Sequence, residues 1–309
     1  MRVVVIGGSG HVGTYLVPRL VALGAEVTVV SRGVREPYRR HGAWRRVTTV
    51  TADRDDPAFP DRIAGLAPDV VVDLICFTEQ QARSLGEALR DRVRHLLHCG
   101  TIWVHGPSGV VPTTEDGPRR PIAEYGRAKA AIEAYLLDAA HRGDLPATVV
   151  HPGHIVGVGW TPVNPAGNVN PAVFAGIAAG EPLTLPNLGM ETLQHVHADD
   201  VARVFCAAMA HRSVAVGESF HAVAPTAVTL RGYAEAVFGW FGHEPRLAYL
   251  PWEQWRETVD AADAEITYDH LAHSPHCGID KARRLLGHHP RYTSLEAVAE
   301  AVDALDLRS

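Results

Sequence analysis

A glycine-rich turn near the N-terminus constrains the fold more than any other feature of the chain. The apolar run at residues 3–6 leads directly into Gly7, Gly10 and Gly13, and residues 11–23 have helical spacing. Glycine permits a tight turn and lets backbone N–H groups approach phosphate oxygens closely. This strand–turn–helix pattern indicates a dinucleotide pyrophosphate site, although its GxxGxxG spacing differs from the usual GxGxxG. We expect cofactor contacts there from Gly7, Ser9, Gly10, His11, Val12 and Gly13.

The first half of the chain alternates between strand-like and helix-like segments. Helical patterns occupy residues 11–23 and 78–93 and a segment around Tyr125, and short apolar runs lie at residues 3–6, 26–30, 47–50, 70–75, 96–99 and 147–150. Strands that are apolar throughout are buried on both faces, which is typical of a parallel sheet covered by helices. The sequence therefore predicts an α/β fold with a Rossmann-type, doubly wound parallel sheet.

The composition of the chain changes after His151. Residues 152–170 are dense in Gly, Pro and Asn, which is typical of a shaped loop region beside a site. Further helices are expected at residues 171–179, 199–209, 230–238, 252–259, 280–286 and 294–305. We expect two parts: a dinucleotide-binding domain at residues 1–150 and 195–224, and a smaller, discontinuous C-terminal substrate lobe at residues 151–194 and 225–309.

The end of the second strand bears on the choice between NAD and NADP. An acidic residue there binds the ribose 2′-OH of NAD, but this chain has Ser31 and Arg32. Arg32 favours NADP because a guanidinium pairs with a 2′-phosphate, although an arginine stacked on adenine gives the same sequence. Asp53, after the third strand, either accepts a hydrogen bond from the adenine amino group or caps a loop.

Tyr125 and Lys129 lie four residues apart, so on a helix they share one face. A free tyrosine has a pKa of about 10. To act as a base near neutrality it needs a pKa lower by roughly 3, which corresponds to about 4 kcal/mol. A lysine ammonium one turn away supplies charge of the required sign. We therefore expect a nicotinamide enzyme that uses Tyr125 as acid and base, with Lys129 lowering the pKa of Tyr125.

Several motifs occur together in an order that belongs to a known family. They are the glycine turn, Thr101, Tyr125-x-x-x-Lys129, His151-Pro152-Gly153, and the segment from His195 to Ala202. With them the chain resembles the extended short-chain dehydrogenase/reductase family, in its NAD(P)-dependent epimerase/dehydratase branch. The resemblance covers nearly the whole chain.

The resemblance assigns roles to individual residues. It implies that Thr101 hydrogen-bonds the reacting oxygen, that Tyr125 is the acid/base, and that Lys129 holds the nicotinamide ribose. It also implies that Ile75, Cys76 and Phe77 line the cofactor after the fourth strand, with Pro152 beside them, and that the C-terminal lobe binds the substrate. Expected substrate contacts are Trp103, His154, Asn168 and Asn170; core packing is an equal alternative for Trp103.

The chain departs from the family pattern where the substrate is recognised. The Asp-Glu pair of family dehydratases is Ile102-Trp103 here, so a dehydratase would lack its acid and base. Leu193 stands where sugar-nucleotide members carry a diphosphate-clamping Arg, and residues 273–276 replace a second one. His270, His273 and His276 have a spacing that zinc could use, but we expect them in a Pro-containing loop, the family needs no metal, and we expect none.

These observations favour an epimerase that oxidises a secondary alcohol transiently, on a sugar or sugar-nucleotide-like substrate with NAD or NADP. The alternatives are an NADP-dependent ketoreductase or dehydrogenase of a sugar-like substrate, and a non-catalytic dinucleotide-binding protein. The intact set of Thr101, Tyr125 and Lys129 argues against the last of these. Family likeness makes a homodimer the expected assembly.

The composition of the chain limits the classes of partner that we expect. A net charge of −6 gives no reason to expect nucleic acid or an acidic membrane surface. The four cysteines form no CxxC pair, which suits reduced thiols in the cytoplasm. No apolar run approaches the length needed to span a membrane. The expected partner is a small-molecule substrate.

Overall fold

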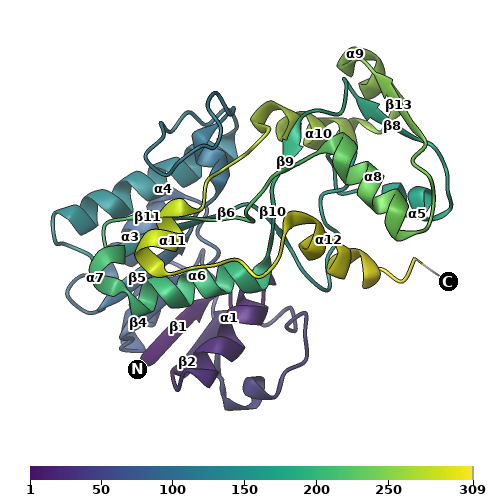
Figure 1. Ribbon diagram of the computed structural model, residues 1–309. Coiled ribbons are helices and arrows are strands. Elements are labelled where there is room, and N and C mark those ends of the chain that lie inside the picture. Colours follow the sequence, from purple (N-terminus) through teal and green to yellow (C-terminus); the bar gives the residue numbers. More distant parts are fainter. Residues whose placement is uncertain (308–309) are drawn as a thin grey trace.

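The protein, described here from a computed structural model, is built around a seven-stranded sheet with strand order β11–β6–β5–β4–β1–β2–β3 (Figure 1). All neighbouring strands in it are parallel. The structure describes residues 1–307, so the last two residues of the predicted substrate lobe lie outside the described part. The sheet strands are β1 (Arg2–Ile6), β2 (Glu26–Ser31), β3 (Thr48–Thr51), β4 (Val70–Asp73), β5 (His95–Cys99), β6 (Ala147–Pro152) and β11 (Ser219–Ala222).

Helices cover both faces of this sheet, which confirms the predicted doubly wound fold. One face packs on α1 (His11–Ala22) and α6 (Ala198–Ala210), and the other on α2 (Phe59–Gly65), α3 (Glu79–Leu89) and α4 (Glu124–His141). Alternate residues of β1 explain the two cores: Val3 and Val5 enter the first, while Val4 and Ile6 enter the second. Short 3-10 turns, η1 (Gly42–Arg46) and η2 (Ile102–His105), follow β2 and β5.

A smaller lobe has its own core and lies at the upper right in Figure 1. Its helices are α5 (Ala172–Ala178), α8 (Leu230–Trp240), α9 (Trp252–Trp255), η3 (Arg256–Thr258), α10 (Ala261–His273) and α12 (Ser294–Asp303). Two two-stranded ribbons belong to this part: β9 (Thr192–Leu193) with β12 (Val228–Thr229), and β8 (Leu183–Pro186) with β13 (Leu247–Leu250). A third, β7 (His154–Val156) with β10 (His195–His197), joins the two cores, because Val196 packs in the core of the sheet domain and Val156 in that of the lobe. Among the described residues, no helix is both long and apolar enough to cross a bilayer.

The structure adds elements that the sequence patterns did not predict. They include β11, which completes the sheet, and α10, which carries His270 and His273. The expectation that this histidine group lies in a loop was therefore wrong for those two residues. The two short helices α7 (Arg212–Ala215) and α11 (Asp280–Leu286) flank α6, and Ala282 and Leu286 of α11 join the core of the sheet domain. The division into two lobes stays a prediction.

His95 links this core to the stability of the fold at different pH values. Its ring is 1% exposed, and Nε2 lies 2.8 Å from Thr148 Oγ1, while Nδ1 has no partner among the described residues. Thr148 Oγ1 itself donates to Ala215 O, so the Nε2–H of His95 is the donor in the contact. Burial, helped by Arg212, lowers the pKa of His95 to about 4.

Stability should therefore fall as the pH is lowered, because the unfolded chain takes up a proton on His95 near pH 6.5 and the folded chain does so near pH 4. Between those values the unfolded state gains up to roughly 3 kcal/mol from this residue. His95→Gln keeps the N–H donor to Thr148 but cannot titrate. Urea unfolding at pH 7.5 and 4.5 should show that the free energy of unfolding falls less for this variant than for the wild type. Exposed His211→Gln is the matched control, and equal losses in all three proteins would contradict the prediction.

Candidate functional site

The glycine turn lies between β1 and α1 at the carboxyl edge of the sheet. Gly7 has φ +79°, and a Cβ there would lie 2.6 Å from Ile75 Cγ2. A Cβ on Gly13 would lie 2.1 Å from Gly8 O, so the first turn of α1 packs directly on the backbone of the loop. These two contacts require glycine. They leave the N-terminal N–H groups of α1 beside the turn, where an anion is favoured.

A hollow of about 500 Å³ opens beside this turn. Eight residues predicted to contact the cofactor border it: Gly7, Ser9, Gly10, Ser31, Arg32, Asp53, Ile75 and Phe77. Sequence reasoning missed others, among them Val34, Arg35, Arg54, Phe59 and Gln81. Arg35 follows Arg32 by three residues in the same basic stretch, which was the available signal. The size and the glycine wall fit one half of a dinucleotide.

Other predicted cofactor residues lie outside this hollow. His11 stacks on Trp160 with ring centroids 3.7 Å apart, and burial, helped by Arg35, lowers its pKa to about 4. Val12 belongs to the core, and Pro152 is buried at the end of β6. Cys76 is 0% exposed and packs into the core, so its side chain is no wall of the hollow. Asp53 borders the hollow and also accepts from Asp55 N as a loop cap.

Thr101, Tyr125 and Lys129 come together at the ends of β5 and α4. Thr101 follows β5 and accepts from Trp103 N, and its side chain also hydrogen-bonds with Tyr125. Lys129 is 2% exposed, and its Nζ donates to Cys76 O at 2.7 Å and to Cys99 O at 2.8 Å. The ammonium lies 5.9 Å from the centre of the Tyr125 ring.

The surroundings of Tyr125 act on its protonation in the cofactor-free chain. The residue is 43% exposed, yet desolvation raises its pKa to about 12; a negative charge on Cys99 adds to the rise, while the hydrogen bond with Thr101 acts in the other direction. Lys129, whose ammonium donates to two carbonyls, is not among the groups that shift this pKa. Burial also lowers the pKa of Lys129 itself.

A buried chain of hydrogen bonds fixes Thr101 against α4. His151 Nδ1 accepts from Thr101 N at 3.0 Å, and His151 Nε2 lies 2.9 Å from Glu133 Oε1. Glu133 also forms a two-pronged ion pair with Arg119 at 2.9 and 2.5 Å. Burial acts to raise the pKa of Glu133, but His151 and Arg119 outweigh it and hold that pKa well below its usual range. Sequence reasoning missed Glu133, although it follows Lys129 by one helical turn.

Trp103 is the centre of a group of rings next to Tyr125. Its ring meets Tyr125 edge-on, with ring centroids 6.2 Å apart, and stacks on His273, with ring centroids 4.3 Å apart. It also meets His154 at 6.5 Å and His270 at 5.3 Å. The structure therefore places one predicted substrate residue, Trp103, beside the tyrosine and another, His154, next to Trp103, and it adds two histidines from α10.

The two predicted asparagines have internal partners instead. Asn168 is 1% exposed, and its side chain bonds Asn164, Asn170 N and Thr267 Oγ1. The side chain of Asn170 donates to Asp263 and accepts from Ala172 N. Their amide groups are used to shape the loop, which corrects the expectation that they bind substrate.

The histidines that raised the question of zinc do not gather around one point. Within the described residues, the trio of potential ligand atoms that lie close together is Asp73, Cys76 and His98, all buried. Asp73 is already paired with Arg54 in a two-pronged contact at 2.8 and 2.6 Å. A guanidinium on the carboxylate makes this a poor place for a cation.

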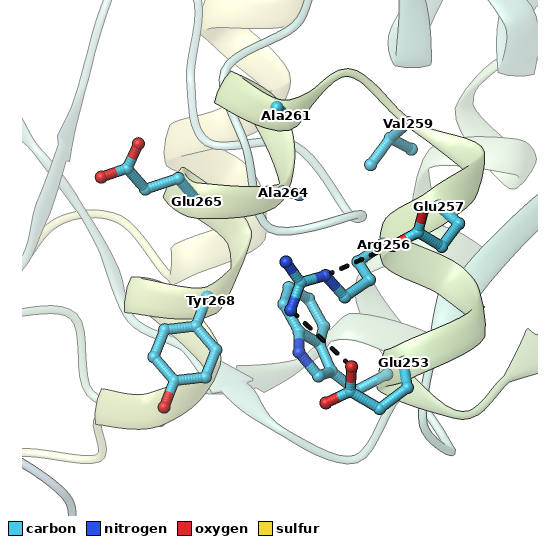
Figure 2. A pocket seen from close by; sticks show the side chains of 9 residues that line it. Glu253, Arg256, Glu257, Val259, Ala261, Ala264, Glu265 and Tyr268 are labelled. Atoms are coloured by element: carbon cyan, nitrogen blue, oxygen red, sulfur yellow. Dashed lines mark ion pairs between the residues drawn. The ribbon is translucent and has the colours of Figure 1, made fainter.

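A second hollow, of about 630 Å³, lies between α9–η3 and α10 and is called the outer hollow below (Figure 2). Three glutamates line it together with Arg256, which pairs with Glu253 at 3.7 Å and Glu257 at 3.8 Å. Tyr268, 55% exposed, and Glu265 project from α10 in Figure 2. The same helix buries His270 and His273 beside Trp103.

Comparison with known proteins matches residues 3–222 to the NAD dependent epimerase/dehydratase family. The 2′-dehydrokanamycin reductase of Streptomyces kanamyceticus is 30% identical over 68% of this chain and 58% of its own length. The UDP-glucose 4-epimerase of Mycolicibacterium smegmatis is 26% identical over 98% of both chains. The solved UDP-glucose 4-epimerase of Thermotoga maritima, with UDP-glucose, shares the fold with a TM-score of 0.75 and 21% identity, over 99% of both chains. The chain belongs to the NAD dependent epimerase/dehydratase family.

Proposed function

We propose that this protein is an epimerase that oxidises a secondary alcohol of a sugar-like substrate and then reduces the resulting ketone on its other face. The observation that supports it is the contact of Tyr125 with Thr101, beside the buried ammonium of Lys129 and at the edge of the sheet that carries the glycine turn. A homodimer and a cytoplasmic location are further proposals, and they rest on the family resemblance.

The residues would divide the work as follows. The N–H groups at the glycine turn hold the pyrophosphate, and the hollow beside Arg32 takes the adenosine half. When bound, the nicotinamide accepts and returns the hydride. Thr101 orients the substrate oxygen, Tyr125 removes its proton and later restores it, and Lys129 holds the ribose.

The protonation state of Tyr125 favours one direction of the proposed reaction at neutral pH. With its pKa raised to about 12, Tyr125 is protonated and ready to act as an acid toward a ketone oxygen. To act as a base it must lose that proton, which a nearby positive charge favours. Lys129 is positioned to contribute once a ribose hydroxyl competes with the carbonyls of Cys76 and Cys99 for its N–H groups.

A reductase that exchanges its cofactor is the second candidate. Arg32 and Arg35 both border the hollow at the end of β2, where a 2′-phosphate would lie, and no acidic side chain follows the strand directly. The similarity to a 2′-dehydrokanamycin reductase points in the same direction. Preference for NADP belongs to this second candidate.

Titration of Tyr125 tests the mechanism. The difference in tyrosinate absorbance between wild type and Tyr125→Phe should give a pKa near 12 for the cofactor-free protein. Saturation with the oxidised cofactor should lower that pKa, because the added positive charge favours the phenolate. Lys129→Met should reduce the change. A pKa at or below 10 without cofactor would contradict the prediction.

The nucleotide that copurifies with the protein separates the two candidates. Denaturation followed by mass spectrometry should release about one NAD(H) per chain if the hydride is recycled within each turnover. An empty site that takes up NADPH on titration would instead favour the reductase. If the protein neither carries a bound nucleotide nor takes up added NAD(H) or NADPH, both candidate functions are rejected.

Arg32→Ala and Arg35→Ala test the cofactor preference. If their guanidiniums face a 2′-phosphate, each variant should weaken NADPH binding by about tenfold or more while NADH binding changes little. Fluorescence titration with both cofactors measures this. Arg62→Ala, on the solvent side of α2, is the control. Equal losses for the two cofactors would mean that the arginines stack on the adenine.

A further inference from the structure

Two histidines in ring contact with Trp103, and a third in ring contact with one of them, carry nitrogen atoms that have no partner among the described residues. They are His154 Nε2, His195 Nδ1 and His273 Nε2. His195 is 0% and His273 1% exposed, and the ring of His154 lies 5.6 Å from that of His195. These three residues are called the imidazole cluster below. Buried polar atoms are normally hydrogen-bonded, so three orphans in one group of rings, joined to Tyr125 through Trp103, indicate a ligand.

The second nitrogen of each ring determines what the orphan offers. His154 Nδ1 accepts from Gln194 N, so the neutral ring carries its hydrogen on the free Nε2. His195 Nε2 donates to Val163 O, and His273 Nδ1 donates to Asp269 O, so the free nitrogens of these two rings are acceptors. The cluster thus presents one donor and two acceptors.

All three rings are uncharged at neutral pH. Burial lowers the pKa of His195 to about 3 and also lowers the pKa values of His154 and His273. A phosphate only accepts hydrogen bonds, and its charge needs buried cations, so two acceptor lone pairs repel it. A hydroxyl both donates and accepts, so it suits all three nitrogens, while an amino group can serve the two acceptors.

The positions where a diphosphate clamp was expected are filled by uncharged residues. Leu193 is 1% exposed and pairs with Val228 between β9 and β12. The chain after His273 is fastened elsewhere, because Ser274 accepts from Thr192 N and His276 O accepts from Thr113 N. The outer hollow on α10 adds three glutamates against one arginine. The charge around this side of the lobe is unfavourable for an anion.

We propose that the substrate is a phosphate-free glycoside, with hydroxyl or amino groups bound by His154, His195 and His273. The sugar stacks or packs against Trp103 and presents its alcohol to Tyr125. This inference rests on the proposed function and names the substrate class of that same site; amino sugars fit it, and nucleotide sugars do not.

The experiment is calorimetry on the full chain saturated with cofactor. The probes are kanamycin, a panel of methyl glycosides, UDP-glucose and UDP. At least one phosphate-free probe should bind, and UDP-glucose should bind at least about 100-fold more weakly. Tighter binding of UDP-glucose, with competition by UDP, would overturn the proposal, and so would failure of every phosphate-free probe to bind.

Variants show whether the imidazole cluster is responsible. His273→Leu and His154→Phe remove one acceptor and one donor, and each should weaken binding of the phosphate-free probe by about tenfold while cofactor affinity is unchanged. His211→Phe, at an exposed helix end, is the control. An unchanged affinity in both cluster variants would overturn the role of these residues.

Cofactor absorbance at 340 nm distinguishes failure of the inference from failure of the proposed function. A phosphate-free glycoside that binds but never changes the redox state of the cofactor would reject hydride transfer and leave the substrate class intact. A nucleotide sugar that is turned over would reject the substrate class and leave hydride transfer intact.

Discussion

The buried ammonium of Lys129 is the interaction on which the site depends. A lysine that is 2% exposed needs partners for its N–H groups, because an unpaired buried charge costs several kcal/mol. It finds them in two carbonyls, one after β4 and one at the end of β5. Helix α4 is thereby held over the ends of two neighbouring strands, and Tyr125, one turn earlier, is brought to Thr101.

A second buried link complements the first. Glu133 lies one turn beyond Lys129 and reaches the backbone of Thr101 through His151. Arg119 balances the charge of the carboxylate, so the whole chain of bonds can lie in the interior. Between them, Lys129 and Glu133 fix α4 to β5 on both sides of the residue that would hold the substrate oxygen. Such support is what keeps reacting groups within a fraction of an ångström of the required geometry.

The sequence predicted the sheet and the main site because those signals are local. A strand–glycine–helix pattern is read from about a dozen residues, and a Tyr-x-x-x-Lys spacing from five. The missed features depend on contacts between distant segments. His273 contacts Trp103, 170 residues earlier in the sequence, and its helix α10 has a weak amphipathic pattern because its buried positions include Thr267, His270 and His273. The pKa of Tyr125 depends on tertiary structure in the same way: desolvation raises it in the cofactor-free chain, while the spacing to Lys129 is visible in the sequence.

The return of the chain at α11 has a consequence for how proteins of this kind diversify. The lobe is not one continuous insertion: the chain leaves the sheet domain after β6, comes back for α6 and β11, leaves again, and returns to place Ala282 and Leu286 in the core of that domain. Recombination that exchanges one continuous segment between related genes could not transfer the whole lobe, because any such segment would separate parts of the chain that pack together. Point substitutions on α10 and in the loops facing it would leave intact the bonds that fix α4, the helix of Tyr125, to the ends of β4 and β5.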